Sequence, residues 1–302
     1  MAGVKSKLFG GGPKGVSIPD PPTAPAGSAE NTPPPVVVTK IDFEAYNLPE
    51  YAHRNALVID NLFTPEDCAR LLAAAEASNE WAVAQLNGGG ALQYTDTSYR
   101  NSGRILYDDH ELADWILDKM RPYLKDTGVE FIADANRHAM LRAPGHDKAN
   151  RGARLTRLNE RLRFLRYGPG EFFKPHVDGS YYTPDRKQVS YYTFQIYLNG
   201  DAKSLKGGAT RFWPKFYHGR RSRTQNGQQR EINYIDVESR TGRVLIFEHE
   251  GLMHSGEEVT KGVKYSVRTD FMYEEVPAEE EQVQPPAATE NQMDIDEPTN
   301  QA

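Results

Sequence analysis

The sequence has almost no cysteine and no long run of apolar residues. Cys68 is the only cysteine among 302 residues, so an intrachain disulfide is impossible. No segment has the stretch of about 20 apolar residues that a membrane helix requires. The first ten residues also lack the apolar core of a secretory signal peptide. We therefore expect a soluble protein of a reducing compartment, the cytoplasm or the nucleus, with no membrane partner.

Both ends of the chain are poor in large apolar residues. Residues 1–38 are dense in Gly and Pro, and residues 274–302 contain nine acidic residues and no Lys or Arg. Such segments cannot bury enough apolar surface to offset the entropy lost on ordering. We therefore predict two disordered tails around a single domain at residues 39–273. Removing the nine tail charges from the formal net charge of −6 leaves +3, so the predicted domain is mildly basic.

Helix signals occur early in the predicted domain. Thr64-Pro65 supplies an N-cap hydroxyl and a proline at the first helical position, and the residues that follow are rich in Ala and Leu. Apolar residues at helical spacing, Leu112 and Ile116 among them, predict a second helix over about residues 109–124.

From residue 161 onward the pattern changes to strands separated by turns. The candidate strands cover residues 162–167, 190–198, 209–213, 232–237, 243–248 and 263–273. Turn signals such as Gly168-Pro169-Gly170 separate them. Helices followed by many strands favour an α+β fold, in which helices cover one face of a β-sandwich or barrel.

Three residues form a candidate metal site. In an extended strand His176 and Asp178 point to the same side, so they can present an imidazole and a carboxylate to one ion. His254 would complete a set of two histidines and one carboxylate, which leaves coordination positions open, as non-haem Fe(II) oxygenases require. Zinc more often uses other ligand sets, and Cys68 has no cysteine partner. His249 is a rival for the third position.

Polar side chains on two predicted strands indicate a pocket for an anionic ligand. Lys264, Ser266 and Arg268 share one face of the last strand, and two inward cations are costly unless an anion pairs with them. The distal carboxylate of 2-oxoglutarate would serve, although Arg268 could instead pair with an acidic residue of the fold. On the strand at 190–198, three polar residues share one face: Thr193, Gln195 and Tyr197.

The order of these motifs resembles the prolyl 4-hydroxylase type of Fe(II)/2-oxoglutarate-dependent dioxygenase. Six elements occur in the order of that family: Tyr167-Gly168-Pro169-Gly170, His176-Val177-Asp178, Tyr197-Leu198-Asn199, Gly207-Gly208, His254 and Lys264. The resemblance implies a double-stranded β-helix, a jelly-roll variant, with N-terminal helices packed on one sheet. Its catalytic core would span about residues 160–273.

The resemblance also implies a role for each site residue. The catalytic iron ligands would be His176, Asp178 and His254. The ligands of the cosubstrate 2-oxoglutarate would be Lys264, helped by Tyr197, with Tyr167 nearby. The pocket for substrate or cosubstrate would also include Arg268, Thr193 and Gln195. Arg268 would bind either 2-oxoglutarate or an anionic group of the substrate. His254 is favoured over His249 because it stands in a family-like His-x-Gly-x-x-Val context.

The implied activity is hydroxylation of a protein side chain, with a prolyl residue as the leading interpretation. The enzyme would consume O₂ and 2-oxoglutarate, release succinate and CO₂, and be supported by ascorbate. The basic stretches at 151–166 and 220–223 leave oxidative dealkylation of nucleic acid as an alternative. Hydroxylation of a small molecule is another, and a non-catalytic jelly-roll binding module ranks last. The loop at 179–189 would gate or contact the substrate, or merely connect strands. Substrate identity and oligomeric state do not follow from the sequence.

Overall fold

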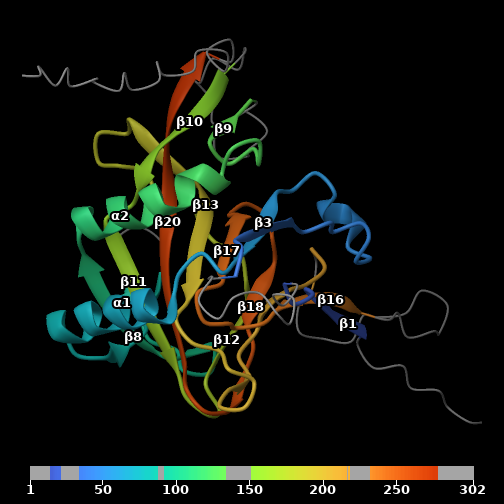
Figure 1. Ribbon diagram of the computed structural model, residues 1–302, viewed down its shortest axis with the longest axis vertical. Helices are drawn as coiled ribbons and strands as arrows, with labels where there is room; N and C mark the ends of the chain where they lie inside the picture. The colour runs from blue at the N-terminus through green and yellow to red at the C-terminus, as the bar shows by residue number, and fades with distance from the viewer. Residues whose placement is uncertain are drawn as a thin grey trace, which may run out of the picture.

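Two β-sheets face each other, and two helices cover the outer face of the larger sheet (Figure 1). The structure is a computed structural model that describes residues 14–21, 34–87, 92–133, 151–215, 217 and 232–277. The smaller sheet has the order β1 (Lys14–Ser17), β16 (Asn233–Val237), β15 (Thr210–Phe212), β18 (His254–Gly256), β12 (Phe172–His176) and β7 (Arg100–Asn101). Within this sheet β1 pairs with β16 in parallel, and the other pairs are antiparallel.

The larger sheet carries the longest strands. Its order is β2 (Val37–Lys40), β3 (Ala56–Asp60), β17 (Val244–Glu248), β13 (Gln188–Tyr197), β20 (Lys264–Pro277), β11 (Arg161–Tyr167), β8 (Gly103–Asp108) and β4 (Ala82–Val83). Two further strands extend it beside β20: β10 (Arg151–Leu158) and β9 (Phe131–Ile132). Two small ribbons complete the strands: β14 (Lys206–Gly207) with β19 (Val259–Lys261), and β5 (Leu86–Asn87) with β6 (Gln93–Tyr94).

The helices are α1 (Pro65–Ser78) and α2 (His110–Met120), with short 3₁₀ turns η1 (Pro49–Tyr51) and η2 (Arg121–Tyr123). The hydroxyl of Thr64 accepts a hydrogen bond from the Asp67 amide, and the Asp67 carboxylate accepts one from the Thr64 amide, which forms a capping box. The predicted start of this helix is therefore confirmed. Helix α2 gives way to η2 earlier than expected, because Pro122 lacks an amide donor and its ring disfavours further α-helix.

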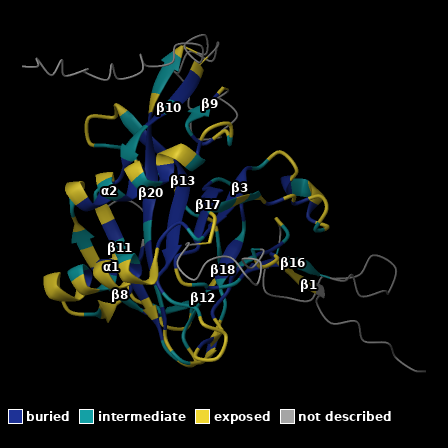
Figure 2. Ribbon diagram, viewed as in Figure 1, coloured by how far each residue is buried: buried dark blue, intermediate teal, exposed yellow. Residues whose placement is uncertain are grey.

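Apolar side chains form two main cores, one on each face of the larger sheet. The long strands of this sheet are largely buried, as Figure 2 shows. The first core lies between that sheet and the helices, where α1 packs against β8 and α2 against β10. The second lies between the two sheets and joins Phe212 and Ile235 of the smaller sheet to Leu245 and Phe247 of the larger one. The two facing sheets with helices on one outer face confirm the predicted α+β jelly-roll class.

The ordered strands extend beyond the domain limits predicted from sequence. Lys14–Ser17 forms β1 on the edge of the smaller sheet, and Ile18 is buried in the core between the sheets. At the other end β20 continues to Pro277 rather than ending at residue 273. Backbone hydrogen bonds to neighbouring strands order these two segments, although their Gly/Pro-rich and acidic compositions predicted disorder. The other predicted tail residues, 1–13, 22–33 and 278–302, lie outside the described residues.

Two further expectations concern loops and membranes. The predicted loop at 179–189 ends early, because Gln188 and Val189 already belong to β13 and Val189 bridges to Tyr182. Among the described residues, no helix is both long enough and apolar enough to cross a membrane.

Candidate metal centre

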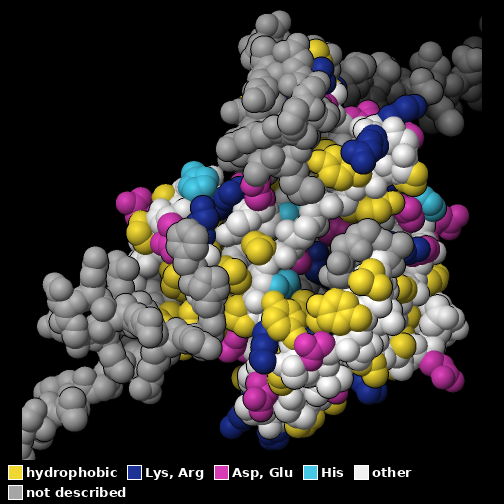
Figure 3. All heavy atoms as spheres, turned by 180° about the vertical axis from the view of Figure 1, so that it is seen from behind, with side chains coloured by type: hydrophobic (Ala, Val, Ile, Leu, Met, Phe, Trp, Pro, Cys, Tyr) yellow, Lys and Arg dark blue, Asp and Glu magenta, His cyan; other side chains and the backbone are white. Residues whose placement is uncertain are grey.

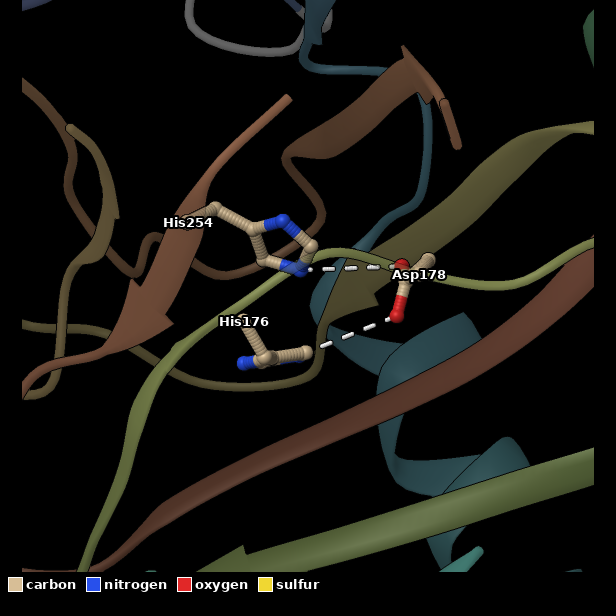
Figure 4. A group of neighbouring side chains, drawn as sticks. All are labelled: His176, Asp178 and His254. Carbon is tan, nitrogen blue, oxygen red and sulfur yellow. Dashed lines mark ion pairs between the residues drawn. The ribbon is translucent and has the colours of Figure 1, made fainter. Parts of the chain in front are cut away.

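His176, Asp178 and His254 converge between the two sheets (Figure 4). His176 ends β12 and His254 begins β18, and an irregularity in the pairing of these strands places the two histidines directly opposite each other. The Nε2 atom of His254 lies 3.6 Å from Oδ2 of Asp178, and Nε2 of His176 lies 3.7 Å from Oδ1. Within the described part of the chain this is the only group of three or more His, Cys, Asp or Glu with metal-ligand spacing.

Both imidazoles are oriented by the backbone. Nδ1 of His176 lies 2.8 Å from the Lys174 carbonyl, and Nδ1 of His254 lies 2.9 Å from the Leu252 carbonyl. Each Nδ1 therefore carries the proton and donates it, which leaves the Nε2 lone pair facing Asp178. Burial lowers the pKa of both rings, most strongly at His176, so both are neutral and able to bind a metal.

The carboxylate of Asp178 is held from its rear side. The hydroxyl of Thr193 donates to Oδ2 at 2.7 Å, and Nη1 of Arg268 lies 2.9 Å from Oδ1. Burial by itself raises the pKa of Asp178, but the charge of Arg268 lowers it well below its usual range. The carboxylate is therefore ionised and fixed in orientation.

His249, the rival third ligand, lies behind Asp178 rather than beside the other ligands. Its Nδ1 is 2.9 Å from the Thr193 hydroxyl, and its Nε2 is 2.9 Å from the Ser190 hydroxyl. Because Thr193 gives its only proton to Asp178, His249 must donate from Nδ1 and accept from Ser190 at Nε2. Ser190 in turn accepts from the Tyr181 amide at 2.8 Å. A chain of hydrogen bonds thus runs from the loop after Asp178 back to its carboxylate.

The opposite end of the cavity carries donors with few partners. Lys264 and Ser266 line the cavity from β20, as the predicted shared face requires. Nζ of Lys264 donates only to the Gly208 carbonyl, at 2.6 Å, among its described contacts. The buried hydroxyl of Ser266 has no hydrogen-bond partner in the described part of the chain. These unused donors fit the distal carboxylate of 2-oxoglutarate.

The Gly207-Gly208 motif has a structural explanation beside Lys264. Both glycines have left-handed backbones, with φ of +75° and +77°. A Cβ on Gly207 would lie 2.2 Å from the Glu258 carbonyl oxygen, so a side chain is excluded there. The turn brings the Gly208 carbonyl to Lys264 and so orients the ammonium group.

The other predicted pocket residues divide into two groups. Tyr167, Thr193, Gln195 and Arg268 line the cavity. Tyr197 is fully buried in the core between the sheets, and its hydroxyl donates to Thr210, which does line the cavity. Direct binding of 2-oxoglutarate by Tyr197 therefore stays a prediction, and the observed contact is one residue removed from the cavity.

Arg100 and Phe173 were not singled out by sequence reasoning, although both line the cavity. The ring of Phe173 stacks on the His176 imidazole, with centroids 3.6 Å apart and planes at 20°. The guanidinium of Arg100 lies over the same phenylalanine ring at 4.6 Å. Arg100 stands on the two-residue strand β7, which is too short to produce a recognisable pattern in the sequence.

Comparison with known proteins identifies the class of this site. The sequence model of the 2OG-Fe(II) oxygenase superfamily matches residues 162–271, the segment that contains the triad and Lys264. The match supports the 2-oxoglutarate-dependent dioxygenase of the prolyl 4-hydroxylase-like type that the motif order predicted. The donor set and the orientation of both imidazoles fit Fe(II). No curated protein matches the chain.

Three solved prolyl hydroxylases are similar to the chain at low identity. A viral collagen prolyl hydroxylase from Paramecium Bursaria Chlorella virus-1, in complex with 2OG, is 18% identical, with 72% of this chain and 96% of that chain covered and a TM-score of 0.42. A prolyl-4-hydroxylase from Pseudomonas putida is 14% identical, with 74% and 95% covered and a TM-score of 0.44. A Trichoplax adhaerens prolyl hydroxylase, in complex with a hypoxia inducible factor peptide fragment, is 13% identical, with 76% and 90% covered and a TM-score of 0.45. Because these TM-scores are low, the fold assignment rests on the strand order and on the family match.

Proposed function

We propose that this dioxygenase hydroxylates a prolyl residue of a protein or peptide and releases succinate and CO₂. One observation carries the proposal: three metal-ligating atoms converge at one end of a cavity whose other end holds the unused donors of Lys264 and Ser266. When bound, Fe(II) and 2-oxoglutarate would supply the oxidising chemistry with O₂, and ascorbate would keep the metal reduced.

Different residues of the cavity would bind the metal, bind the cosubstrate and exclude water. His176, Asp178 and His254 would hold the metal, and Lys264 would orient the cosubstrate through its distal carboxylate. Apolar side chains in the cavity wall, Leu165 and Phe247, would exclude water from the reacting centre.

The surroundings of Asp178 support a substrate larger than the cavity. Val177 and Tyr181, on either side of Asp178 in the sequence, are 44% and 38% exposed. Exposed apolar side chains next to a buried ligand provide a surface on which a peptide can rest while one residue enters the cavity. This rim, together with the prolyl-hydroxylase motif order, favours a peptide over a small molecule.

The nucleic-acid alternative gains no support from the basic stretch at 151–166. Five of its six arginines pair with acids or stack: Arg151 with Glu275, Arg157 with Glu160, Arg161 with Asp108, Arg163 with Asp270, and Arg166 over Trp81. On the face drawn in Figure 3, the described Lys and Arg side chains are scattered among acidic and apolar ones. The second stretch, at 220–223, lies outside the described residues.

Turnover of 2-oxoglutarate tests the activity, and mass spectrometry tests the substrate. Purified protein with Fe(II) and ascorbate should form succinate, and His176→Ala should not. His110→Ala, at an exposed position of helix α2, should match the wild type. Proteome digests incubated with the wild type should contain prolines that gain one oxygen. Succinate formation that His176→Ala retains would contradict the assigned metal site, and oxygen gained only on other residues or on nucleobases would contradict the prolyl assignment.

A further inference from the structure

The cavity contains more positive charge than iron and 2-oxoglutarate would use. Its described lining includes three cations, Arg100, Lys264 and Arg268, and a single acid, Asp178. The Fe(II) ion would add two positive charges, which the two carboxylates of 2-oxoglutarate would balance. The three side-chain cations are therefore opposed by one lining carboxylate, so the occupied cavity would still attract an anion.

Two of the three cations have assigned partners. Arg268 pairs with Asp178 at 2.9 Å, and its Nη2 lies 3.6 Å from Asp270 behind the cavity. Lys264 has the unused donors assigned above to the distal carboxylate of 2-oxoglutarate. Arg268 is thus ion-paired with two acids of the fold, which was one of its three predicted alternatives, and only its buried Nε has no hydrogen-bond partner among the described residues.

Arg100 is the cation without an acidic partner. It forms no ion pair with any carboxylate of the described residues. Its hydrogen bonds to the Ser102 hydroxyl and the Gln85 carbonyl are long, at 3.4 and 3.5 Å, and it also interacts with the neutral hydroxyl of Tyr167. Burial lowers its pKa, and the charge of Arg268 acts in the same direction, while Tyr167 and Asp178 oppose the change. An arginine stays charged in proteins nonetheless, so this site carries a desolvated cation.

The position of Arg100 is fixed next to the metal centre. Strand β7 pairs with β12 so that Arg100 lies opposite Phe173. The guanidinium covers the Phe173 ring, and that ring covers the His176 imidazole, so the cation stands one ring away from a metal ligand. A group bound by Arg100 would therefore lie close to the reacting carbon of the substrate.

Neighbouring charges add to the field at this position. Arg104, on the adjacent strand β8, has its pKa lowered to about 10 by burial and by the charges of Arg100, Arg163 and Arg161. Such crowding of like charges is relieved when an anion binds. A guanidinium binds a carboxylate through two parallel hydrogen bonds, which is a strong and directional contact.

We propose that Arg100 binds a carboxylate of the substrate beside the hydroxylated carbon, so that the enzyme selects acidic substrates. The carboxylate would be an Asp or Glu side chain next to the target proline, or the free carboxylate at the end of a peptide. The inference rests on the proposed peptidyl hydroxylation and narrows its substrate class.

Matched peptides test this charge selection. Pentapeptides with a central proline would carry Asp or Asn on either side, each with a free or an amidated C-terminus. Their binding to the anaerobic wild-type Fe(II)·2-oxoglutarate enzyme would be measured by calorimetry, and oxygen gain by mass spectrometry under air. We expect at least one carboxylate-bearing peptide to bind about 10- to 100-fold more tightly than its neutral counterpart, the range that loss of a charged hydrogen bond produces. The Asp and free-terminus arms identify the source of the carboxylate.

Variants assign the preference to Arg100. In Arg100→Gln the ratio of the affinity for the carboxylate-bearing peptide to that for its neutral counterpart should fall to about one. The Fe(II) content and the KM for 2-oxoglutarate in peptide-free turnover should stay unchanged. Arg104→Gln is the matched control, because Arg104 also donates to the Gln85 carbonyl, at 3.4 Å, but does not line the cavity. It should retain most of the wild-type preference, because Arg104 contributes only its charge and does not contact the bound carboxylate.

Three results would overturn the inference: equal binding of acidic and neutral peptides, binding of neither, or a higher KM for 2-oxoglutarate in Arg100→Gln with the peptide preference intact. The last would assign Arg100 to the cosubstrate. Failure of the proposed function is distinguishable from these. If acidic peptides bind with an Arg100-dependent preference but no proline gains oxygen, prolyl hydroxylation fails and charge selection stands.

Discussion

The two ends of the cavity differ in how completely their polar groups are satisfied. At the Asp178 end, Thr193, Arg268 and His249 form a continuous network behind the carboxylate, in which Nε of Arg268 has no hydrogen-bond partner among the described residues. At the Lys264 end, one ammonium group has a single acceptor and the Ser266 hydroxyl has no partner among the described residues. The first end is built to orient a ligand of the metal, whereas the second is built to receive a molecule. The difference predicts that changes at the two ends will fail in different ways.

Removal of a metal ligand should have the largest effect, because it should abolish both Fe(II) binding at the Asp178 end and turnover of 2-oxoglutarate held at the Lys264 end. His254→Ala removes an imidazole whose Nε2 faces Asp178. We expect Fe(II) retention and succinate formation to fall to background, as measured by metal analysis and 2-oxoglutarate turnover. His249→Ala should retain measurable turnover, because His249 lies behind Asp178. Equal loss in both variants would mean that the third ligand is misassigned.

Replacement of Lys264 should affect the cosubstrate end alone. Lys264→Met is expected to raise the KM for 2-oxoglutarate about 10- to 100-fold, through loss of a charged hydrogen bond, and to leave Fe(II) binding intact. The folded protein should not lose stability, because burying this cation with one partner opposes folding. Thermal melts and Michaelis kinetics together would check both parts, and a KM unchanged from the wild type would remove Lys264 from the cosubstrate site.

The pH dependence of 2-oxoglutarate binding is a second test of whether the charge of Lys264 binds the cosubstrate. Burial lowers the pKa of Lys264 to about 8 from its ordinary 10.5. A lowered lysine pKa means that the cation is lost as pH rises through about 8, so the KM for 2-oxoglutarate should rise about tenfold per pH unit above that value. The cost of burying the charge is fully present below pH 8 and disappears as pH approaches 10.5. Lys264→Arg stays charged, and its KM should be flat from pH 7 to 9.5; a parallel rise in that variant would assign the pH effect to another group.

Disruption of the network behind Asp178 should have a smaller effect on the metal. Thr193→Val keeps the shape of the side chain but leaves Asp178 and His249 each short of a partner. We expect Fe(II) affinity to fall about tenfold and the free energy of unfolding by about 1–3 kcal/mol. Thr269→Val is the control, because this buried threonine of the same strand pair donates to the Asn159 carbonyl, away from the cavity. It should lose stability without loss of Fe(II) affinity, as competition with a chelator would reveal.

The smallest effect should come from the helix layer, far from both ends. Thr64→Ala removes the capping hydroxyl of α1. A loss of about 1 kcal/mol in the free energy of unfolding is expected, with kinetics unchanged. Chemical denaturation and 2-oxoglutarate turnover measured on the same sample would check this, and an altered KM would show that the helices influence the cavity.

The site and the fold were predictable to different degrees, for physical reasons. The His-x-Asp spacing, the alternation along residues 190–198 and the face shared by Lys264, Ser266 and Arg268 follow from the two-residue period of a strand. Strand β10 was not predicted, because its buried positions include the small residues Gly152 and Ala153, and its arginines suggested a basic surface. The partner of Arg268 and the place of Arg100 depend on contacts between distant strands, which no local pattern encodes.

The predicted face of the strand at 190–198 also shows where periodicity stops being informative. Thr193 and Gln195 line the cavity, as expected from their alternation. Tyr197 continues the same alternation, yet the cavity ends before it and its hydroxyl meets Thr210 instead. Periodicity sets the direction of a side chain, while the depth of the cavity depends on the opposite sheet.

An anaerobic titration of 2-oxoglutarate into the purified protein, with and without Fe(II), tests the central claim most directly. The account predicts one molecule bound per chain, with tight binding that requires Fe(II), is lost in His176→Ala and is weakened in Lys264→Met. Failure of the wild type to bind 2-oxoglutarate in the presence of Fe(II), or binding that is the same in all three proteins, would contradict it.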